Sequence, residues 1–437
     1  MTNLENYWLP FTPNKYFKQH PKMVVLAKGA YYTTESGNQL FDCLSGLWCS
    51  PIGHSHPKIV EAFTKQAQTL DFAPSFQVGS PNAFKLAECI AKMAPEGLDR
   101  VFFCNSGSEA VDTALKVALA YHGARGDSKR TRFIGRERGY HGVGFGGISV
   151  GGMVANRKAF SSAMLPSIDH LPHTWDTTQM GFSKGQPNWG AHLAENLERL
   201  VALHDASTIA AVIVEPMQGS TGVIVPPVGY LQKLREICTK HGILLIFDEV
   251  ITGFGRLGEN FGAQKLGVTP DIITFAKAVT NGVIPLGGII AKRSIYEAFM
   301  SINQPEHMAE LFHGYTYTGH PMACAVGLAC LDIYQEEGLF KRSAELALVL
   351  ENAVHSLKGE DGVTDIRNFG LAAAIDLAPF SMPGLRAFKV FEHGFANQHL
   401  FRITADTISL APPFISTPKE IENMIDGLRT AIRTVKE

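Results

Sequence analysis

Short runs of mostly apolar residues recur through the middle of the chain, and segments with helical periodicity separate them. These runs cover residues 101–104, the region around Phe133, and residues 210–214, 243–247, 272–275 and 287–291. A strand that is apolar at nearly every position is buried on both faces, as in a parallel sheet with helices on either side. Helical patterns supply such helices at residues 57–70, 81–93, 230–241 and in the segment that ends near Tyr121. The sequence therefore predicts an α/β fold with a mainly parallel, doubly covered sheet.

The regular alternation ends near Pro321, where longer helices and a few strands, including residues 372–375, take over. A chain of 437 residues is long enough for two or three domains. We expect a large domain at residues 57–322 and a smaller α+β domain at residues 323–437. Residues 1–56 are rich in proline and aromatic side chains, and we expect them to pack with the small domain.

The composition is that of an ordinary globular protein, with 45% hydrophobic and 18% charged residues. A formal net charge of −2 gives no reason to expect a nucleic acid or an anionic membrane as partner. No apolar run has the length of a membrane span, and no secretory signal is evident. The seven cysteines are scattered, which fits a reduced, cytoplasmic compartment, and the 16 histidines show no metal-ligand spacing.

An acidic residue and a lysine stand at the ends of two of the apolar runs. Asp248 ends the first of these runs, and Lys277 closely follows the second. Ligands of parallel α/β sheets bind at the carboxyl ends of the strands. An acid and a lysine that meet there indicate pyridoxal phosphate chemistry, with the lysine holding the cofactor aldehyde and the acid on the pyridine nitrogen. Taken alone, a lysine after a strand is more often a solvated strand end.

A phosphate-binding turn is indicated directly after the run at residues 101–104. Ser106 and Glu109 match the S-x-x-E capping box, and an apolar helical face follows them. The unpaired N–H groups of a helix start attract a phosphate. Gly107 allows close approach and Ser108 can add a hydroxyl group. An ordinary capped helix is the commoner meaning of this motif when it stands alone.

A glycine-rich stretch at residues 142–152 contains two motifs in the wrong setting. Residues 142–147 match the dinucleotide pattern G-x-G-x-x-G, with Asp169 at a suitable distance, and residues 147–151 match G-x-S-x-G. No buried strand runs directly into the stretch, and no helix is expected after it. We expect a flexible glycine-rich loop near the active site. Tyr140 and His141 precede it and can offer an aromatic face to a flat cofactor.

The order and spacing of six motifs resemble the class III (subgroup II) aminotransferases, which are fold-type I pyridoxal phosphate enzymes. The motifs are SGSEA (106–110), GYHG (139–142), VEPMQGSTG (214–222), FDEVITGFGRLG (247–258), PDIITFAKAVTNGVIPLGG (270–288) and HGYTYTGHP (313–321). Longer stretches resemble the β-alanine–pyruvate, or ω-amino acid–pyruvate, aminotransferases: RERGYHGVGFGGISVGGM, HDASTIAAVIVEPM and HGILLIFDEVIT. The resemblance covers nearly the whole chain.

The resemblance implies a role for each matching cofactor residue. Lys277 is implied as the Schiff-base lysine and Asp248 as the partner of the pyridine nitrogen. The other implied cofactor contacts are Gly107 and Ser108 at the phosphate, Tyr140 and Val250 on the two ring faces, and His141 and Glu215 nearby. Thr316 is similar to the threonine that reaches the phosphate of the neighbouring subunit. A homodimer with shared active sites, or a tetramer built from such dimers, is therefore implied.

The resemblance also implies a substrate pocket. Trp48, Phe11 and Phe76 fall where relatives place pocket aromatics, and Arg402 resembles the arginine that binds the substrate carboxylate. Ser409 stands where close relatives carry a polar amide near that carboxylate. Three further departures from common family choices are Ala278, Gln218 and Thr318.

The reaction implied is a ping-pong transfer of an amino group from an ω-amino acid, such as β-alanine, or a primary amine to pyruvate. A buried lysine amine with a lowered pKa can carry the proton between carbons. Other class III activities stay open: taurine, 4-aminobutyrate or diamine aminotransferase, decarboxylase, racemase or aminomutase. A nicotinamide oxidoreductase using residues 142–147 is an alternative from another class.

Overall fold

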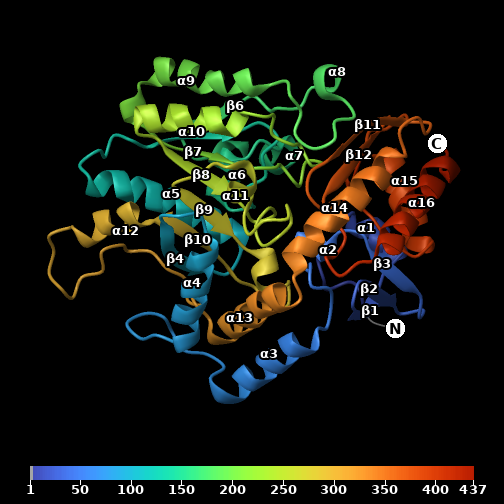
Figure 1. The fold of residues 1–437 in the computed structure, drawn as a ribbon, viewed down its shortest axis with the longest axis horizontal. Coiled ribbons are helices and arrows are strands. Elements are labelled where there is room, and N and C mark those ends of the chain that lie inside the picture. The colour runs from blue at the N-terminus through green and yellow to red at the C-terminus, as the bar shows by residue number, and fades with distance from the viewer. Residues whose placement is uncertain (1–2) are drawn as a thin grey trace.

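A seven-stranded mixed sheet forms the centre of the computed structural model, which describes residues 3–437 (Figure 1). In spatial order its strands are β4 (Leu98–Cys104), β10 (Gly287–Lys292), β9 (Ile272–Phe275), β8 (Leu244–Asp248), β7 (Ile209–Val214), β5 (Arg132–Arg136) and β6 (Ile168–Leu171). Only β10 runs antiparallel to its neighbours. The mainly parallel sheet predicted from the apolar runs is confirmed.

Alternate residues of the central strands enter two separate hydrophobic cores. On β8, Leu244 and Ile246 belong to one core, whereas Leu245 and Phe247 belong to the other. Helix α5 (Gly107–Ala124) packs in the first core and α10 (Tyr230–His241) in the second. Since each strand buries both faces, its apolar pattern is continuous rather than alternating.

The four helices predicted from periodicity are confirmed as α5, α10, α3 (Pro57–Thr69) and α4 (Pro81–Met93). Proline occupies the first turn of both α3 and α4, where its missing N–H costs no hydrogen bond. The other α-helices are α1 (Asn14–Gln19), α2 (Ser45–Trp48), α6 (Phe145–Val150), α7 (Val154–Lys158), α8 (Thr177–Met180), α9 (Asn196–His204), α11 (Gly262–Leu266), α12 (Arg293–Met300), α13 (Pro321–Glu336), α14 (Leu339–His355), α15 (Leu385–Ala396) and α16 (Pro418–Thr434).

Two four-stranded sheets lie to one side of the central sheet, next to α14, α15 and α16 (Figure 1). One contains β1 (Val24–Lys28), β2 (Tyr31–Thr34), β3 (Gln39–Asp42) and β13 (His399–Leu400). The other contains β11 (Val363–Asn368), β12 (Ala373–Leu377), β15 (Thr407–Leu410) and β14 (Arg402–Thr404). Because β3 pairs with β13, the N-terminal segment shares a sheet with the C-terminal part of the chain. Domain boundaries near residues 56 and 322 stay a prediction.

The expectation of a flexible loop after Gly142 is wrong, because residues 145–150 form the short helix α6. The glycines there allow close packing: a Cβ at Gly144 or Gly146 would lie within 2.5 Å of the Asp112 carboxylate. The same carboxylate accepts a hydrogen bond of 3.0 Å from the N–H of Gly147. Ser149 lies buried inside α6 and donates to the Phe145 carbonyl, so it does not form a nucleophile elbow.

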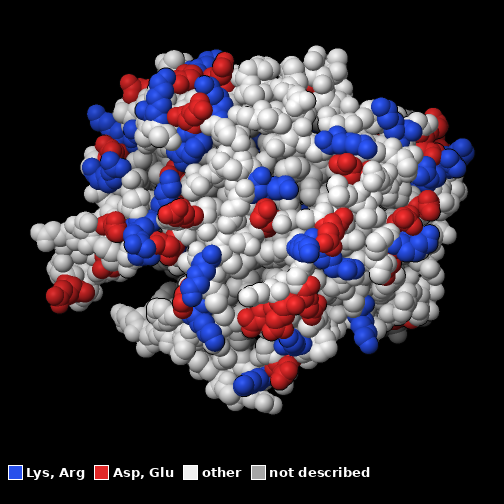
Figure 2. Space-filling view, viewed as in Figure 1, with Lys and Arg blue, Asp and Glu red and all other residues white. Residues whose placement is uncertain are grey.

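Charged side chains of both signs are interspersed over the face shown in Figure 2. Within residues 3–437, no helix is both long and apolar enough to cross a membrane. The same residues contain no cluster of three or more histidine, cysteine or acidic side chains with the arrangement of a metal site.

The packing of α6 on the sheet generates a stability prediction at Gly135 in β5. A Cβ at this position would lie 1.9 Å from the carbonyl oxygen of Val150, which is backbone and cannot rotate away. We expect Gly135→Ala to destabilise the protein by about 2–3 kcal/mol or more, as overpacking does. Urea unfolding measures the change.

Gly123 in α5 provides the control, because a Cβ there would meet nothing within 4 Å. We expect Gly123→Ala to be neutral or to stabilise by up to about 1 kcal/mol, because alanine favours a helix over glycine. Equal stability of the two variants would contradict the packing argument.

Candidate active site

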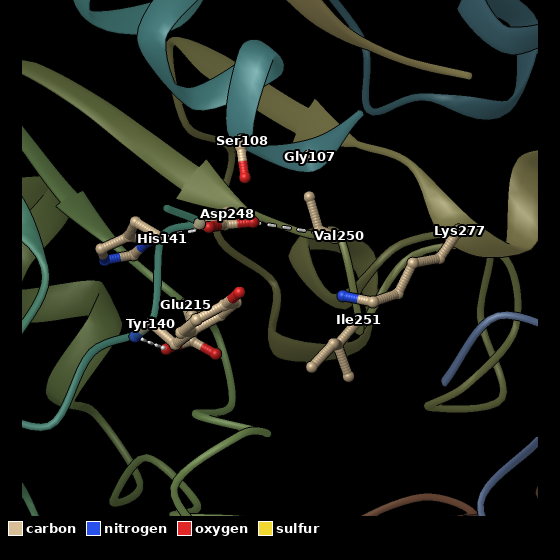
Figure 3. Close-up of a pocket in the computed structure, with 10 residues that line it drawn as sticks. Gly107, Ser108, Tyr140, His141, Glu215, Asp248, Val250, Ile251 and Lys277 are labelled. Carbon is tan, nitrogen blue, oxygen red and sulfur yellow. Dashed lines mark hydrogen bonds and ion pairs between the residues drawn. The ribbon is translucent and has the colours of Figure 1, made fainter. Parts of the chain in front are cut away.

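A cavity of about 120 Å³ opens at the carboxyl edge of the central sheet, where β5, β7, β8 and β9 end (Figure 3). Its lining residues are Gly107, Ser108, Tyr140, His141, Gly142, Glu215, Asp248, Val250, Ile251 and Lys277. Eight of these ten were predicted from the sequence as cofactor-binding residues. Gly142 and Ile251 were not assigned to the site, although both lie inside the family motifs.

The turn before α5 forms one wall of the cavity. Ser106 caps the helix by accepting a hydrogen bond from the N–H of Glu109 at 3.2 Å. The predicted capping box is only half formed, because the Glu109 carboxylate accepts from the N–H of Asn105 instead of Ser106. The same carboxylate accepts a second hydrogen bond, from the side-chain amide of Asn105 at 2.9 Å. The two bonds fix the turn.

Two glycines allow the chain to pack closely around this helix start. A Cβ on Gly107 would lie 3.0 Å from Val250, and a Cβ on Gly142 would lie 2.4 Å from the Ser108 hydroxyl. The Ser108 oxygen accepts from the N–H of Val143 at 3.1 Å, which leaves its hydrogen free to donate. The free N–H groups of a helix start and a serine hydroxyl suit a phosphate group.

Asp248 is the buried acid of the site. It accepts hydrogen bonds from His141 Nδ1 at 2.8 Å, from Thr274 Oγ1 at 3.0 Å and from the N–H of Val250 at 3.2 Å. These donors stabilise a carboxylate that is only 5% exposed. The other ring nitrogen of His141 is buried without a hydrogen-bond partner among the described residues. Sequence reasoning missed Thr274, although a lone threonine inside an apolar strand was a usable signal.

Glu215 lies beside Asp248 and ties two backbone segments together. Its carboxylate accepts from the N–H of Tyr140 at 2.9 Å and from the N–H of Gly219 at 3.1 Å. The pKa of Glu215 is raised to about 7, mainly by burial and also by the charge of Asp248, against the opposing effect of His141. The bond to the Tyr140 N–H places that residue at the cavity.

Lys277 enters the cavity from the opposite side, with its amine directed toward Val250 and Ile251 (Figure 3). It begins the 3₁₀ turn η4 (Lys277–Thr280) and has a left-handed φ of +52°. Burial lowers the pKa of the Lys277 amine, and the negative charge of Asp248 partly opposes this shift. An amine with a lowered pKa can accept and return protons near neutral pH.

The structure places the predicted substrate residues outside the lining of this cavity. Trp48 is buried, whereas Phe11 and Phe76 are 73% and 59% exposed. Arg402 and Ser409 are cross-strand partners on β14 and β15. Phe11 and Arg402 line a second, mainly apolar cavity between the N-terminal segment and α15.

Arg402 has no carboxylate partner among the described residues within salt-bridge distance. Burial lowers the pKa of Arg402, and Tyr140 opposes that shift. The charge of Arg402 in turn opposes the rise in the pKa of Tyr140 that burial, Asp248 and Glu215 cause. Arg402 therefore lies near the Tyr140 side of the site with its charge available.

Thr316 is exposed and does not line the cavity. Its predicted contact with the cofactor of a neighbouring subunit stays a prediction. Of the other departures from family choices, Ala278 is buried, Gln218 donates to the Glu137 carbonyl at 3.0 Å, and Thr318 accepts from the N–H of Tyr315.

The cavity fits pyridoxal 5′-phosphate. The start of α5 with its Ser108 hydroxyl can take the phosphate, a buried carboxylate can pair with a ring nitrogen, and a lysine of lowered pKa lines the same cavity. Together with the sheet topology, this combination defines the class of fold-type I pyridoxal-phosphate enzymes.

Comparison with known proteins gives the family. Residues 14–432 match the model of class-III aminotransferases, and the chain belongs to this family. It is 54% identical to an omega-aminotransferase of Caulobacter vibrioides, over 99% of this chain and 98% of the relative. It is 49% identical to a beta-alanine–pyruvate aminotransferase of Pseudomonas aeruginosa, over 99% and 96%. A PLP-bound amine transaminase from an uncultivated Pseudomonas species has a TM-score of 0.91 at 35% identity, with 98% of each chain covered. The protein is accordingly a pyridoxal-phosphate-dependent aminotransferase.

A second buried carboxylate, Glu249, follows Asp248 and was not singled out from the sequence. It accepts hydrogen bonds from the N–H groups of Gly262 and Ala263 at the start of α11, and from the Thr252 hydroxyl at 2.9 Å. Burial raises the pKa of Glu249 from 4.5 to about 7 against the effect of these donors. Glu249 thereby anchors the segment that follows Val250.

The raised pKa of Glu249 predicts a pH dependence of stability. The folded protein holds this proton more tightly than the unfolded chain, so the stabilisation is complete below pH 4.5 and is lost as pH rises to about 7. Glutamine mimics the neutral acid. We expect the free energy of unfolding of Glu249→Gln, relative to wild type, to rise by about 3 kcal/mol between pH 4.5 and pH 7.5.

Urea unfolding at several pH values measures this difference, and subtracting the wild-type curve removes the shared titration of the histidines. Glu259→Gln, at an exposed position, is the control with no expected pH-dependent difference. A flat difference curve for Glu249→Gln would show that Glu249 keeps its ordinary pKa.

Proposed function

We propose that the protein transfers an amino group from an ω-amino acid, such as β-alanine, or a primary amine to pyruvate. The observation that carries this proposal is the shared cavity of Asp248 and Lys277, combined with the free charge of Arg402 near Tyr140. The printed names of the two curated relatives, an omega-aminotransferase and a beta-alanine–pyruvate aminotransferase, support the choice of donor and acceptor.

Each cofactor-binding residue has a proposed role that follows from its chemistry. Gly107 and Ser108 hold the phosphate at the start of α5, and Asp248 holds the pyridine nitrogen in its protonated form. Tyr140 and Val250 close the two faces of the ring, and Lys277 binds the cofactor covalently. Bound in this way, pyridoxal phosphate withdraws electrons from the substrate carbon that loses a proton.

Lys277 is the proposed proton carrier of the reaction. Because burial lowers the pKa of its amine, a larger fraction of the amine is neutral and able to take a proton from the substrate carbon. His141 keeps the Asp248 carboxylate oriented through its Nδ1 bond of 2.8 Å. Glu215 holds the Tyr140 backbone and so fixes the aromatic ring at the cavity.

The substrate carboxylate is the proposed ligand of Arg402. A guanidinium group binds a carboxylate through two parallel hydrogen bonds. Ser409 pairs with Arg402 across the strands and is proposed to assist at the same carboxylate. Trp48, Phe11 and Phe76 are the proposed aromatic walls of the remaining substrate pocket.

A homodimer with shared active sites, or a tetramer of such dimers, is part of the proposal. Thr316 and Phe76 are exposed, and Phe76 packs near Gly314 in the same stretch as Thr316. An exposed site residue is expected where a second subunit completes the site. All seven cysteines are free thiols, which supports a reduced, cytoplasmic compartment.

The nicotinamide alternative loses support from the structure of residues 142–147. The Asp112 carboxylate accepts from the N–H of Gly147 at 3.0 Å, in the place where a dinucleotide site would need its N–H groups free for phosphates. A carboxylate there repels an anionic ligand.

A donor panel with pyruvate tests the proposed reaction. We expect β-alanine, 4-aminobutyrate, putrescine or 1-phenylethylamine to yield alanine only when pyruvate is present, and taurine belongs in the same panel. The measurement is alanine formation by the purified holoenzyme. Lys277→Ala is the control, and we expect it to lose at least about three orders of magnitude in kcat, as loss of a nucleophile and base does.

Repeated turnover of a donor without any keto acid, beyond one equivalent per active site, would contradict the proposal and indicate a racemase, mutase or decarboxylase. Borohydride reduction and peptide mapping add an independent check, since the cofactor must be recovered on Lys277.

Arg402→Leu tests the proposed carboxylate contact. We expect the KM for pyruvate to rise roughly ten- to a hundredfold, the cost of losing a charge-assisted hydrogen bond. The half-reaction with 1-phenylethylamine, which has no carboxylate, is expected to keep its rate. Steady-state and single-turnover kinetics measure the two effects.

Arg433→Leu, on the exposed end of α16, removes a guanidinium that pairs with Glu360 and serves as the matched control. An equal loss for pyruvate and for 1-phenylethylamine in Arg402→Leu would rule out a specific carboxylate contact.

A further inference from the structure

The turn that carries Lys277 meets a second part of the chain, residues 50–53, through the side chain of Asn281. The amide oxygen of Asn281 accepts from the N–H of Ile52 at 2.9 Å, and its amide nitrogen donates to the Gly53 carbonyl at 2.6 Å. The Asn281 carbonyl accepts from the Ser50 hydroxyl at 3.2 Å. Asn281 is only 3% exposed, so water does not replace these bonds.

The lysine turn has an unfavourable backbone at both ends. Lys277 has φ +52° and Asn281, directly after η4, has φ +53°. A residue with a Cβ stays in this left-handed conformation only when its surroundings hold it there. Asparagine tolerates the conformation better than most residues, which fits position 281.

The contact behind the turn is close enough to exclude any side chain. A Cβ on Gly282 would lie 2.9 Å from Cys49 Sγ and 3.1 Å from Ser50 Oγ. The N–H of Gly282 donates back to the Lys277 carbonyl at 3.3 Å. The lysine turn and residues 49–53 therefore fit together in one register, and Asn281 makes the side-chain hydrogen bonds between them.

The facing segment is itself fixed. Ser45 and Trp48 have left-handed φ values of +49° and +67°. Asp42 is fully buried and accepts from the N–H of Gly46 at 2.6 Å. Since this segment cannot shift easily, it provides a rigid support against which Asn281 holds the lysine turn.

We propose that Asn281 is a positioning residue for Lys277. Its amide group holds the lysine turn against residues 52 and 53 and so fixes where the Lys277 amine lies relative to Asp248. The inference rests on the proposed role of Lys277, but it does not depend on which donor or acceptor the enzyme uses.

Two variants separate the amide group from the backbone conformation. Asn281→Gly suits a positive φ and lacks both amide hydrogen bonds. Asn281→Asp keeps the shape and the acceptor for Ile52, and it loses the donor to Gly53. Asn260→Ala is the matched control, because the Asn260 amide also donates to a backbone carbonyl, that of Met93, at 3.0 Å in another part of the fold.

The experiment uses purified holoenzyme and three measurements: the pH midpoint of the visible absorbance of the bound cofactor, kcat with KM, and the unfolding temperature. In Asn281→Gly we expect the pH midpoint to move by about half a unit or more, because the charge environment changes around the Lys277 nitrogen that is bonded to the cofactor. We expect kcat to fall roughly ten- to a hundredfold, with KM for the amine within about threefold of wild type.

Asn281→Asp is expected to move the pH midpoint at least as far as Asn281→Gly, because a buried carboxylate oxygen then faces the Gly53 carbonyl in place of the amide donor. Asn260→Ala is expected to lower the unfolding temperature without moving the midpoint or kcat.

A wild-type midpoint and kcat in Asn281→Gly would overturn the inference, since the amide would then be dispensable. A fall in unfolding temperature and kcat with an unmoved midpoint in both Asn281 variants would also overturn it, because the role would be structural only. The midpoint needs no substrate, so failure of the donor panel would not affect this test. Recovery of the cofactor on a residue other than Lys277 would instead refute the proposed function.

Discussion

Two consecutive carboxylates at the end of β8 impose the main constraint on this structure, because both are buried. Asp248 faces the cavity, and Glu249 faces the start of α11. Burial of a carboxylate is costly unless donors surround it. For Asp248 the donors come from β9, from the segment after β5 and from the segment that follows β8. These hydrogen bonds offset the cost of burial and also order the loops of the site.

Hydrogen bonds to buried carboxylates also explain why loops form the cavity and are yet closely held. Tyr140 reaches the site because its N–H donates to Glu215, and Gly219 is tied to the same carboxylate. Val250 is held by Asp248, and the segment after it is held by Glu249. A residue that lines the cavity is thus positioned through its own backbone N–H, which donates to the buried carboxylate of a neighbour.

The sequence predicted the parts of this arrangement that are local. Continuous apolar runs predicted the strands, and the carboxyl ends of those strands brought Asp248 and Lys277 to one edge of the sheet. Partners distant in the sequence could not be read in this way. Asn281 bonds to Ile52 and Gly53, which lie 229 and 228 positions before it in the chain. No sequence periodicity indicates contacts over such a separation.

Local signals also misled in two instances, each for a physical reason. The glycines at residues 142–147 resemble a loop, but α6 forms because Asp112 on α5 supplies an acceptor and needs space that only glycine leaves. The half-formed capping box at Ser106 has a similar origin, since Asn105 offers Glu109 two donors. Local composition predicted the conformation of a segment poorly where a side chain outside that segment determined the conformation.

The position of Lys277 combines both kinds of information. Its place after β9 follows from the strand pattern, whereas its left-handed backbone depends on contacts with residues 49–53, far away in the sequence. A strand end alone would leave the long lysine side chain free to sample many rotamers. Because the backbone is held at both ends of η4, the Lys277 side chain starts from a fixed Cα position. The side chain itself stays long enough to move a proton. The reactive amine can therefore combine a fixed origin with a mobile end, which a reaction at two neighbouring carbons requires.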